Sequence, residues 1–181
     1  MNLGKTINDT IKHIKNHIIY LVSNNKAAVR FLSIFFILTL FFFIFFYLIQ
    51  DNLTFLLSWT ASTAGLFANI LGLSVTVNGV ILASESMNFE IIHECTGIFA
   101  IMIITSSIIA YPTALKEKLM GILFVIPLIL GLNLIRIIVI IYIGKYHTHL
   151  FEYVHSYLWQ GTFIIFIILA FFLWIELVVN R

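Results

Sequence analysis

The sequence predicts an all-α polytopic membrane protein with about four to five transmembrane helices, and two observations carry this prediction. Hydrophobic residues make up 61% of the 181 residues and charged residues only 10%, whereas an ordinary soluble domain has roughly 25% charged residues. The mean hydropathy is +1.08. The apolar residues also fall in runs that are long enough to cross a hydrocarbon core of about 30 Å. A chain of this length has room for several spans but for no separate soluble domain of useful size.

The first thirty residues form a basic segment. Five lysines and arginines stand there against one acid, Asp9. Apolar residues at positions 11, 14, 18, 19 and 21 alternate with polar ones at a helical spacing, which indicates an amphipathic helix lying on a membrane face. We therefore divide the chain into a basic amphipathic N-terminal segment, residues 1–30, and a single transmembrane domain, residues 31–181.

The first span is the Phe-rich run from Phe31 to Ile49. It is long and no small-residue cleavage site follows, so we expect a retained helix rather than a signal sequence. The run from Leu53 to Leu73 is also long enough to span, but serine, threonine, glycine and asparagine dilute it. It either lies in the interface or re-enters the membrane, or it spans and the next segment returns. The polar dilution favours the first alternative.

The segment after Leu73 predicts a short extracytoplasmic hairpin, because Asn78-Gly79 stands between β-prone residues. The remaining elements are two spans, a polar loop and a last span: Thr96–Tyr111, Leu119–Ile143, Lys145–Tyr157 and Leu158–Val179.

The distribution of basic residues predicts the orientation. Lysine and arginine collect on cytoplasmic flanks. The N-terminal segment, the loop of residues 112–118 and Arg181 should therefore be inside. The region from Gln50 to Cys95 and the loop of residues 145–157 are then outside.

Three residues are unusual in this setting. Cys95 is the only cysteine and begins an apolar run, while His155 stands just before the last one. Arg136 lies within a span, where a charge costs roughly 2.5–3.5 kcal/mol on insertion scales and often marks a functional site. Asn133 lies one helical turn before it. Taken singly, the thiol could be a packing residue, the arginine could snorkel and the histidine could be a surface residue, but the predicted topology brings all three to the outer leaflet.

Acyl transfer through a thiol is the chemistry that needs these groups. A neighbouring cation favours the thiolate of Cys95, and His155 would serve as base and then as acid toward the leaving amine. Arg136 would stabilise the thiolate or the oxyanion. Gly97 allows a substrate chain to approach closely, and the helix that begins at Thr96 offers unpaired N–H groups.

The motifs around these residues resemble those of the exosortase/archaeosortase family. The family has a Cys-Ser-Gly-Ile-like box, an Asn-x-x-Arg box and a late histidine. Their counterparts in this sequence are Glu94-Cys95-Thr96-Gly97-Ile98, Asn133-Leu134-Ile135-Arg136-Ile137 and His155. The similarity covers roughly residues 66–177. Thr96 stands where serine is usual, which keeps the hydroxyl.

The resemblance implies a membrane-embedded cysteine transpeptidase in the cytoplasmic (plasma) membrane of a prokaryote, with its active site facing outside and residues 31–181 as its catalytic domain. Such enzymes cut exported proteins that end in a short motif, a transmembrane helix and a basic tail, and they pass the new carboxyl end to a lipid or surface acceptor. Cys95 would be the nucleophile, Arg136 the stabiliser and His155 the third member, with Asn133, Thr96 and Gly97 binding substrate or supporting the site. No metal, cofactor or nucleic acid is implied.

Two other classes of function remain open. His147, His149, Glu152 and His155 share one polar loop, to which His93 and Glu94 could add ligands, so a metal site is one alternative. A non-enzymatic scaffold or a small transporter, with Asn133 and Arg136 lining an interior path, is the other. Metal analysis tests the first, and the reactivity of Cys95 toward thiol reagents tests the second.

Overall fold

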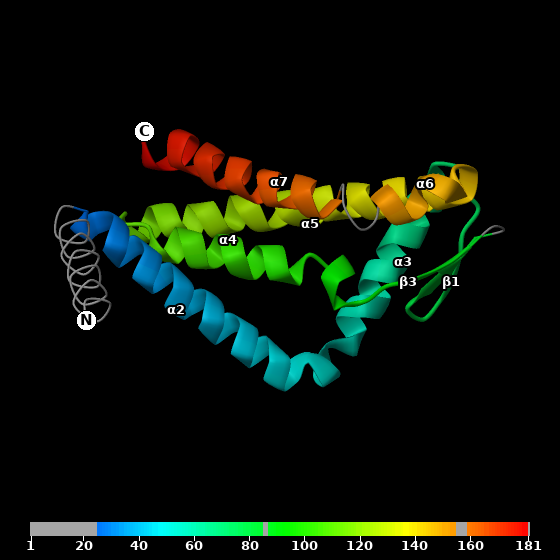
Figure 1. Ribbon diagram of the computed structural model, residues 1–181, viewed down its shortest axis with the longest axis horizontal. Coiled ribbons are helices and arrows are strands. Elements are labelled where there is room, and N and C mark those ends of the chain that lie inside the picture. Colours follow the sequence, from blue (N-terminus) through cyan, green and yellow to red (C-terminus); the bar gives the residue numbers. More distant parts are fainter. Residues whose placement is uncertain (1–24, 85–86, 155–158, 181) are drawn as a thin grey trace, which may run out of the picture.

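The computed structural model describes residues 25–84, 87–154 and 159–180 (Figure 1). Most of the predicted amphipathic helix, residues 1–24, lies outside the described residues, and so does His155.

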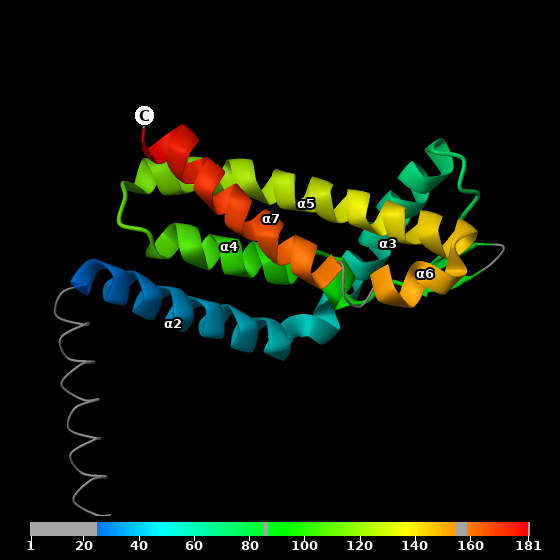
Figure 2. The same cartoon turned by 45° about the horizontal axis from the view of Figure 1, so that its top comes forward.

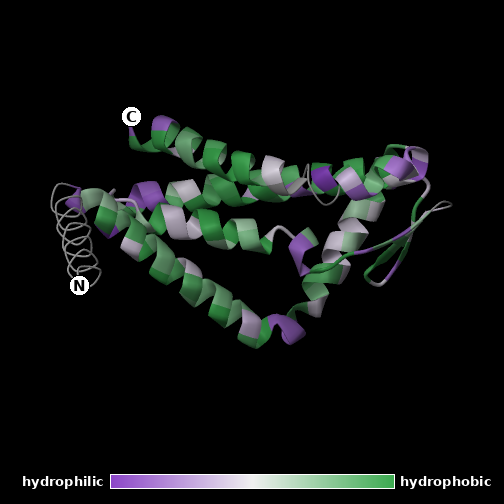
Figure 3. Ribbon diagram, in the orientation of Figure 1, coloured by the Kyte–Doolittle hydropathy of each residue, from purple (hydrophilic) through white to green (hydrophobic). Residues whose placement is uncertain are grey.

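Four helices run side by side and form an elongated bundle (Figures 1 and 2). They are α2 (Lys26–Ile49), α4 (Ile98–Ala110), α5 (Leu115–Tyr146) and α7 (Trp159–Trp174), the last followed by the π-helical turn η4 (Ile175–Val179). Most of their residues are hydrophobic (Figure 3). Within the described residues, three helical stretches are long and apolar enough to cross a membrane, residues 26–70, 115–146 and 161–179, while α4 is a shorter apolar helix. The predicted all-α polytopic class is confirmed.

The stretch of residues 26–70 bends in its middle. After α2, the short 3-10 helix η1 (Gln50–Leu53) changes the direction of the chain, and α3 (Thr54–Ile70) leads away from the α2 axis (Figure 1). One face of α3 packs on α5 through small buried residues, and the other exposes Phe55, Trp59, Leu66, Phe67 and Ile70. An exposed apolar face of this kind is what the interfacial interpretation of residues 53–73 requires.

The predicted hairpin is present as part of a three-stranded antiparallel sheet. Its strands are β1 (Thr76–Asn78), β2 (Ile81–Ala83) and β3 (Asn88–Glu90), in that order across the sheet. Asn78 pairs with Ile81, so the two loop residues are Gly79 and Val80, one position later than the Asn-Gly pair indicated. Gly79 has φ +64°, which a two-residue hairpin loop with glycine first requires. The strand β3 was not predicted.

Two boundaries in the second half of the chain differ from the predicted ones. The helix α5 begins at Leu115 rather than Leu119, because the carboxylate of Glu117 accepts hydrogen bonds from the Thr113 hydroxyl and the Ala114 N–H and so caps the helix. The segment predicted as a polar loop contains the end of α5 and a helix, α6 (Thr148–Tyr153). The ring of Phe151 on α6 lies 5.7 Å from that of Phe89 on β3, and this tertiary contact holds α6 against the sheet.

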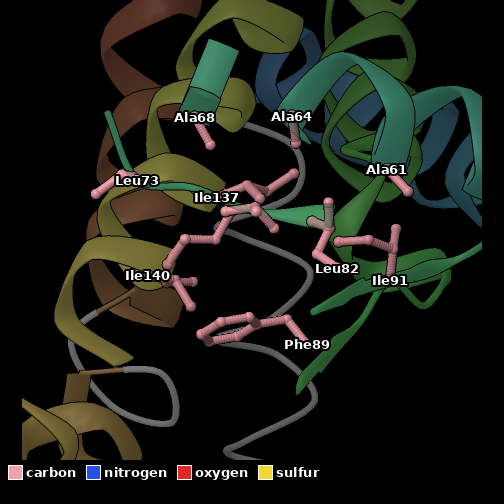
Figure 4. Close-up of a cluster of buried hydrophobic side chains, with 11 residues drawn as sticks. Ala61, Ala64, Ala68, Leu73, Leu82, Phe89, Ile91, Ile137 and Ile140 are labelled. Carbon is pink, nitrogen blue, oxygen red and sulfur yellow. The ribbon is translucent and has the colours of Figure 1, made fainter. Parts of the chain in front are cut away.

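Two buried clusters of apolar side chains lie along α5. The first joins α3, the sheet and the C-terminal half of α5 (Figure 4): Ala61, Ala64, Ala68, Leu73, Val75, Leu82, Phe89, Ile91, Ile137, Ile140 and Ile141. The second joins α4, the N-terminal half of α5 and α7: Ala100, Ile104, Ile108, Val125, Ile129, Ala170 and Trp174. The stretch of α5 between the two clusters, residues 130–136, carries two of the predicted site residues.

Candidate active site

A single 3-10 turn, η2 (His93–Cys95), holds the thiol just before α4. The Cys95 N–H donates to the Ile92 carbonyl at 2.9 Å. The buried Thr96 hydroxyl donates to the His93 carbonyl at 2.7 Å and accepts the Ile98 N–H at 3.3 Å. Thr96 therefore ties the turn to the first residue of α4.

Gly97 lets α4 begin directly against α5. Its φ is +80°, a conformation that costs other residues roughly 1–2 kcal/mol. A Cβ atom at Gly97 would lie 3.4 Å from the Cβ and Cγ atoms of Asn133. The close neighbour at Gly97 is thus Asn133, whereas the sequence pattern was interpreted as room for a substrate chain.

Asn133 and Arg136, three residues apart on α5, both reach the turn that carries Cys95. Asn133 Nδ2 donates to the Cys95 carbonyl oxygen at 2.6 Å, and Arg136 Nη1 donates to the Glu94 carbonyl at 3.4 Å. The guanidinium also lies over the ring of Phe163 in α7, 5.5 Å from its centroid, and within electrostatic range of Cys95. Residues 38 to 42 positions apart in the chain therefore meet at one site. The third residue predicted to lie there, His155, is outside the described residues.

Several polar atoms of this site are buried and have no hydrogen-bond partner among the described residues. They are Asn133 Oδ1, Arg136 Nε and His93 Nδ1. The Asn133 amide is oriented by its bond to Cys95, which needs a donor, so the oxygen is the unpaired atom. An unpaired buried polar group costs about 1–3 kcal/mol. The site thus holds one unsatisfied acceptor, on Asn133, and one unsatisfied donor, on Arg136, close to the thiol.

The sequence pattern did not single out His93 except as a possible metal ligand. It belongs to the same turn as Cys95, and its ring lies edge-on to that of Phe46 in α2 at 5.3 Å. The signal available in the sequence was its position two residues before the only cysteine.

Two cavities adjoin the site. The first, of about 160 Å³, lies between α3 and α5 and is lined by Trp59, Thr60, Thr63, Thr96, Leu130, Gly131, Asn133, Leu134 and Ile137. The second, of about 170 Å³, lies between β3, α5 and α6 and is lined by Met87, Asn88, Phe89, Glu90, Ile91, Cys95, Ile137, Ile140, Ile141 and Phe151. Ile137 lines both cavities, and the first reaches Asn133 while the second reaches Cys95.

Comparison with known families decides what kind of protein this is. The sequence matches the transmembrane exosortase family over residues 17–175, which include every predicted site residue. The chain belongs to the exosortase family. Neither a search of curated proteins nor a search of solved structures gave a match. This exosortase-family protein is therefore a multi-pass membrane protein whose family was predicted from its three sequence boxes.

The described part of this exosortase-family protein provides no metal site. The rings of His147 and His149 lie 6.2 Å apart, but no three histidine, cysteine, aspartate or glutamate side chains of the described residues are grouped so that they could hold a metal ion. The remaining ligand of that alternative, His155, is outside this part of the chain.

Proposed function

We propose that this protein is a membrane-embedded cysteine transpeptidase. In this proposal it cleaves exported proteins at their C-terminal sorting signals, at the outer face of the cytoplasmic membrane. It then transfers the new carboxyl end of each protein to a lipid or surface acceptor. The observation that carries the proposal is the hydrogen bond from Asn133 to the carbonyl of Cys95, which holds the only thiol of the chain beside Arg136. A cysteine that only fills space needs no guanidinium from a membrane-spanning helix next to it.

The unpaired atoms of the site are complementary to a peptide group. A peptide offers one N–H donor and one C=O acceptor. Asn133 Oδ1 can accept such an N–H, and Arg136 Nε can donate to such a C=O, and neither has another partner among the described residues. A bound peptide would satisfy both atoms and so regain part of the cost of burying them. This favours a peptide bond as the group on which the thiol acts.

The reaction proceeds in two acyl transfers. The Cys95 thiolate attacks the scissile carbonyl carbon, the C–N bond breaks, and the leaving amine takes a proton from the imidazolium of His155. Arg136 stabilises the oxyanion of the tetrahedral intermediate. A nucleophile of the acceptor then attacks the thioester carbonyl, His155 takes its proton, and the C–S bond breaks to restore the thiolate. The role of His155 is inferred from its resemblance to the family's late histidine.

The depth of the site along α5 fits a substrate that is anchored by its own transmembrane helix. Lys116, Glu117 and Lys118 stand at the start of α5, and at 1.5 Å per residue Asn133 lies about 27 Å from Leu115. That is close to the thickness of a hydrocarbon core, about 30 Å. With the basic end inside, Cys95 meets a substrate where its anchoring helix leaves the membrane, and the sheet and α6 lie beyond this level.

The test is to trap the acyl enzyme. The substrate is an exported protein with a C-terminal motif, an apolar helix and a basic tail that the wild-type enzyme processes. Without acceptor, the wild-type enzyme should accumulate a hydroxylamine-sensitive adduct on Cys95, detected by mass spectrometry. Cys95→Ala should give neither adduct nor product at an unchanged protein level, and Cys95→Ser should be almost as inactive, because a hydroxyl is rarely ionised near neutral pH. Full processing by Cys95→Ala would end the transpeptidase proposal.

Two further variants assign the base. His155→Ala should retain some activity, because the thiol still ionises in part beside Arg136 and a helix N-terminus. His93→Ala should be compared with it, since His93 Nδ1 is buried without a partner in the described structure. If His93→Ala alone removes the activity, the histidine of the η2 turn is the base in place of His155.

A further inference from the structure

The sheet has an unpaired edge on the side of the candidate site. The strand β3 is one of the two outer strands, and β2 is the only strand of the described residues that pairs with it. The Ile91 N–H donates to the Val80 carbonyl at 2.9 Å, and the Ser84 N–H donates to the Met87 carbonyl at 3.0 Å, so residues 87 and 91 turn their main-chain groups toward β2 and its flanks. Because these directions alternate along a strand, the main-chain N–H and C=O groups of Asn88 and Glu90 face away from β2.

This edge is held in place while remaining open. Phe89 is buried, and its ring contacts that of Phe151 at 5.7 Å, so the strand is anchored on α6 and the end of α5. The two residues beside it, Asn88 and Glu90, are exposed. Proteins usually cover or blunt a sheet edge, because it is a template for pairing with another chain. An edge that is anchored by a buried side chain and unpaired in the described structure is suited to take up a partner strand.

The same edge leads to the thiol. Residues 87–91 line a cavity of about 170 Å³ together with Cys95. Its other walls are apolar and come from α5 and α6: Ile137, Ile140, Ile141 and Phe151. From Glu90 the chain continues through Ile91 and Ile92 into the turn that carries Cys95. A peptide lying along β3 would therefore reach the nucleophile at one end and place side chains against an apolar wall.

The geometry points to β-strand addition as the way in which this enzyme binds its substrate. An extended segment of the exported protein pairs with the outer edge of β3, exchanging hydrogen bonds with the main chain of Asn88 and Glu90. Alternate side chains of that segment enter the apolar cavity, and the scissile bond reaches Cys95. Main-chain pairing supplies affinity in this mode of recognition, and the pockets for alternate side chains supply specificity. The inference rests on the proposed function and adds the conformation and the register of the substrate.

Two substitutions at one position test the edge itself. Glu90→Pro removes the outward N–H and puts a ring in its place, but it leaves the bonds between β2 and β3 intact, since proline is tolerated on edge strands with this orientation. Glu90→Ala lacks the same carboxylate and keeps the N–H. The probe is a tagged C-terminal segment of an exported protein that the wild-type enzyme processes. Glu90→Pro should process it about tenfold more slowly than Glu90→Ala, the effect of losing about one hydrogen bond and adding a clash.

A third measurement separates a lost docking edge from a damaged fold. The rate at which iodoacetamide alkylates Cys95 in intact membranes should be the same in both variants, because the small reagent does not need the edge. A lower rate or a lower protein level in Glu90→Pro alone would assign the loss to folding. In that case a set of modified substrates provides the test. Synthetic copies of the segment, each with one N-methylated residue, should be processed poorly when the N-methyl group is at every second position.

The outcomes for the function and for this inference differ. Processing that survives in Cys95→Ala overturns the transpeptidase proposal and strand addition with it. Processing that depends on Cys95 but is equally fast in Glu90→Pro and Glu90→Ala, with no period of two among the N-methylated substrates, overturns strand addition alone. A loss in Glu90→Pro at normal Cys95 alkylation, together with the period of two, supports it.

Discussion

Arg136 carries a charge in a membrane-spanning helix, and only some of its N–H donors have hydrogen-bond partners in the described structure. One of them, Nη1, reaches the Glu94 carbonyl, while Nε is buried without a partner in the described structure. The planar guanidinium also stacks over the ring of Phe163. A fork of fixed donors can hold a carbonyl oxygen or an oxyanion with two bonds, and an ammonium group cannot. The shape of the group, in addition to its charge, should therefore matter for the reaction.

We predict that Arg136→Lys inserts normally into the membrane but processes substrate at least about a hundredfold more slowly, the usual effect of losing an oxyanion donor. The measurement is the processing rate at matched protein level. Arg30→Lys is the control. Arg30 is exposed near the start of α2, and the start of α2 lies at the end of the molecule opposite the sheet (Figure 1). The same exchange there should leave processing unchanged. Near-normal processing by Arg136→Lys would reduce this residue to a packing or snorkelling role.

At the residue scale, the sequence pointed to candidate residues but not to the bonds that join them. Cys95, Asn133 and Arg136 were identified because a lone thiol and a charge within apolar sequence are costly or reactive and so are informative. The bonds that join them are made to main-chain carbonyls of Cys95 and Glu94. Main-chain partners carry no side-chain signature, so these bonds and the position of His93 could not be predicted from residue types.

The helix α5 comes very close to the strand β3 at Gly144. A Cβ atom there would lie 2.5 Å from Cζ of Phe89 and 2.7 Å from its Cε1. Phe89 is buried and its ring also contacts Phe151, so the ring has little freedom to move by itself. Any added atom at Gly144 should shift β3 as a whole, and with it the edge that we propose binds the substrate.

We predict that Gly144→Ala lowers the thermal unfolding midpoint in detergent and slows processing severalfold, because overpacking of this kind costs about 1–3 kcal/mol. Gly161→Ala in α7 is the matched control, since a Cβ there meets no atom of the described residues within 4 Å, and alanine is the better helix former by about 1 kcal/mol. It should be as stable as the wild type or more so. If both variants behave alike, the contact between α5 and β3 does not position the strand.

At the element scale, what could be predicted depended on whether the cause is local. The long apolar runs gave the bundle helices, and the Asn78-Gly79 pair gave the hairpin. The strand β3 is three residues long and owes its conformation to pairing with β2. The helix α6 lies in a polar segment and is fixed by the contact of Phe151 with Phe89. Tertiary contacts of this kind leave no periodic pattern in a short segment.

The whole molecule has two ends with different characters. The start of α2, the loop between α4 and α5 and the end of α7 lie at one end, and the sheet, α6 and the end of α3 lie at the other (Figures 1 and 2). The candidate site lies between them, about 27 Å along α5 from its first residue. With 13 residues, α4 is shorter than a usual span, because it begins at this level, just after the turn η2 that carries Cys95.

This arrangement predicts the orientation of the molecule in the membrane. The end with Arg30, Lys116 and Lys118 should be cytoplasmic, because basic flanks are retained inside. In a Cys95→Ala background, single cysteines at positions 51 and 149 should react with a membrane-impermeant maleimide in intact cells, whereas a cysteine at position 116 should react only after the membrane is opened. Asp51, Lys116 and His149 are all exposed, so each variant is expected to fold and to report accessibility. Labelling at position 149 only after opening would put α6 and the sheet in the cytoplasm, and the proposed meeting of Cys95 with exported substrates at the outer surface would then be excluded.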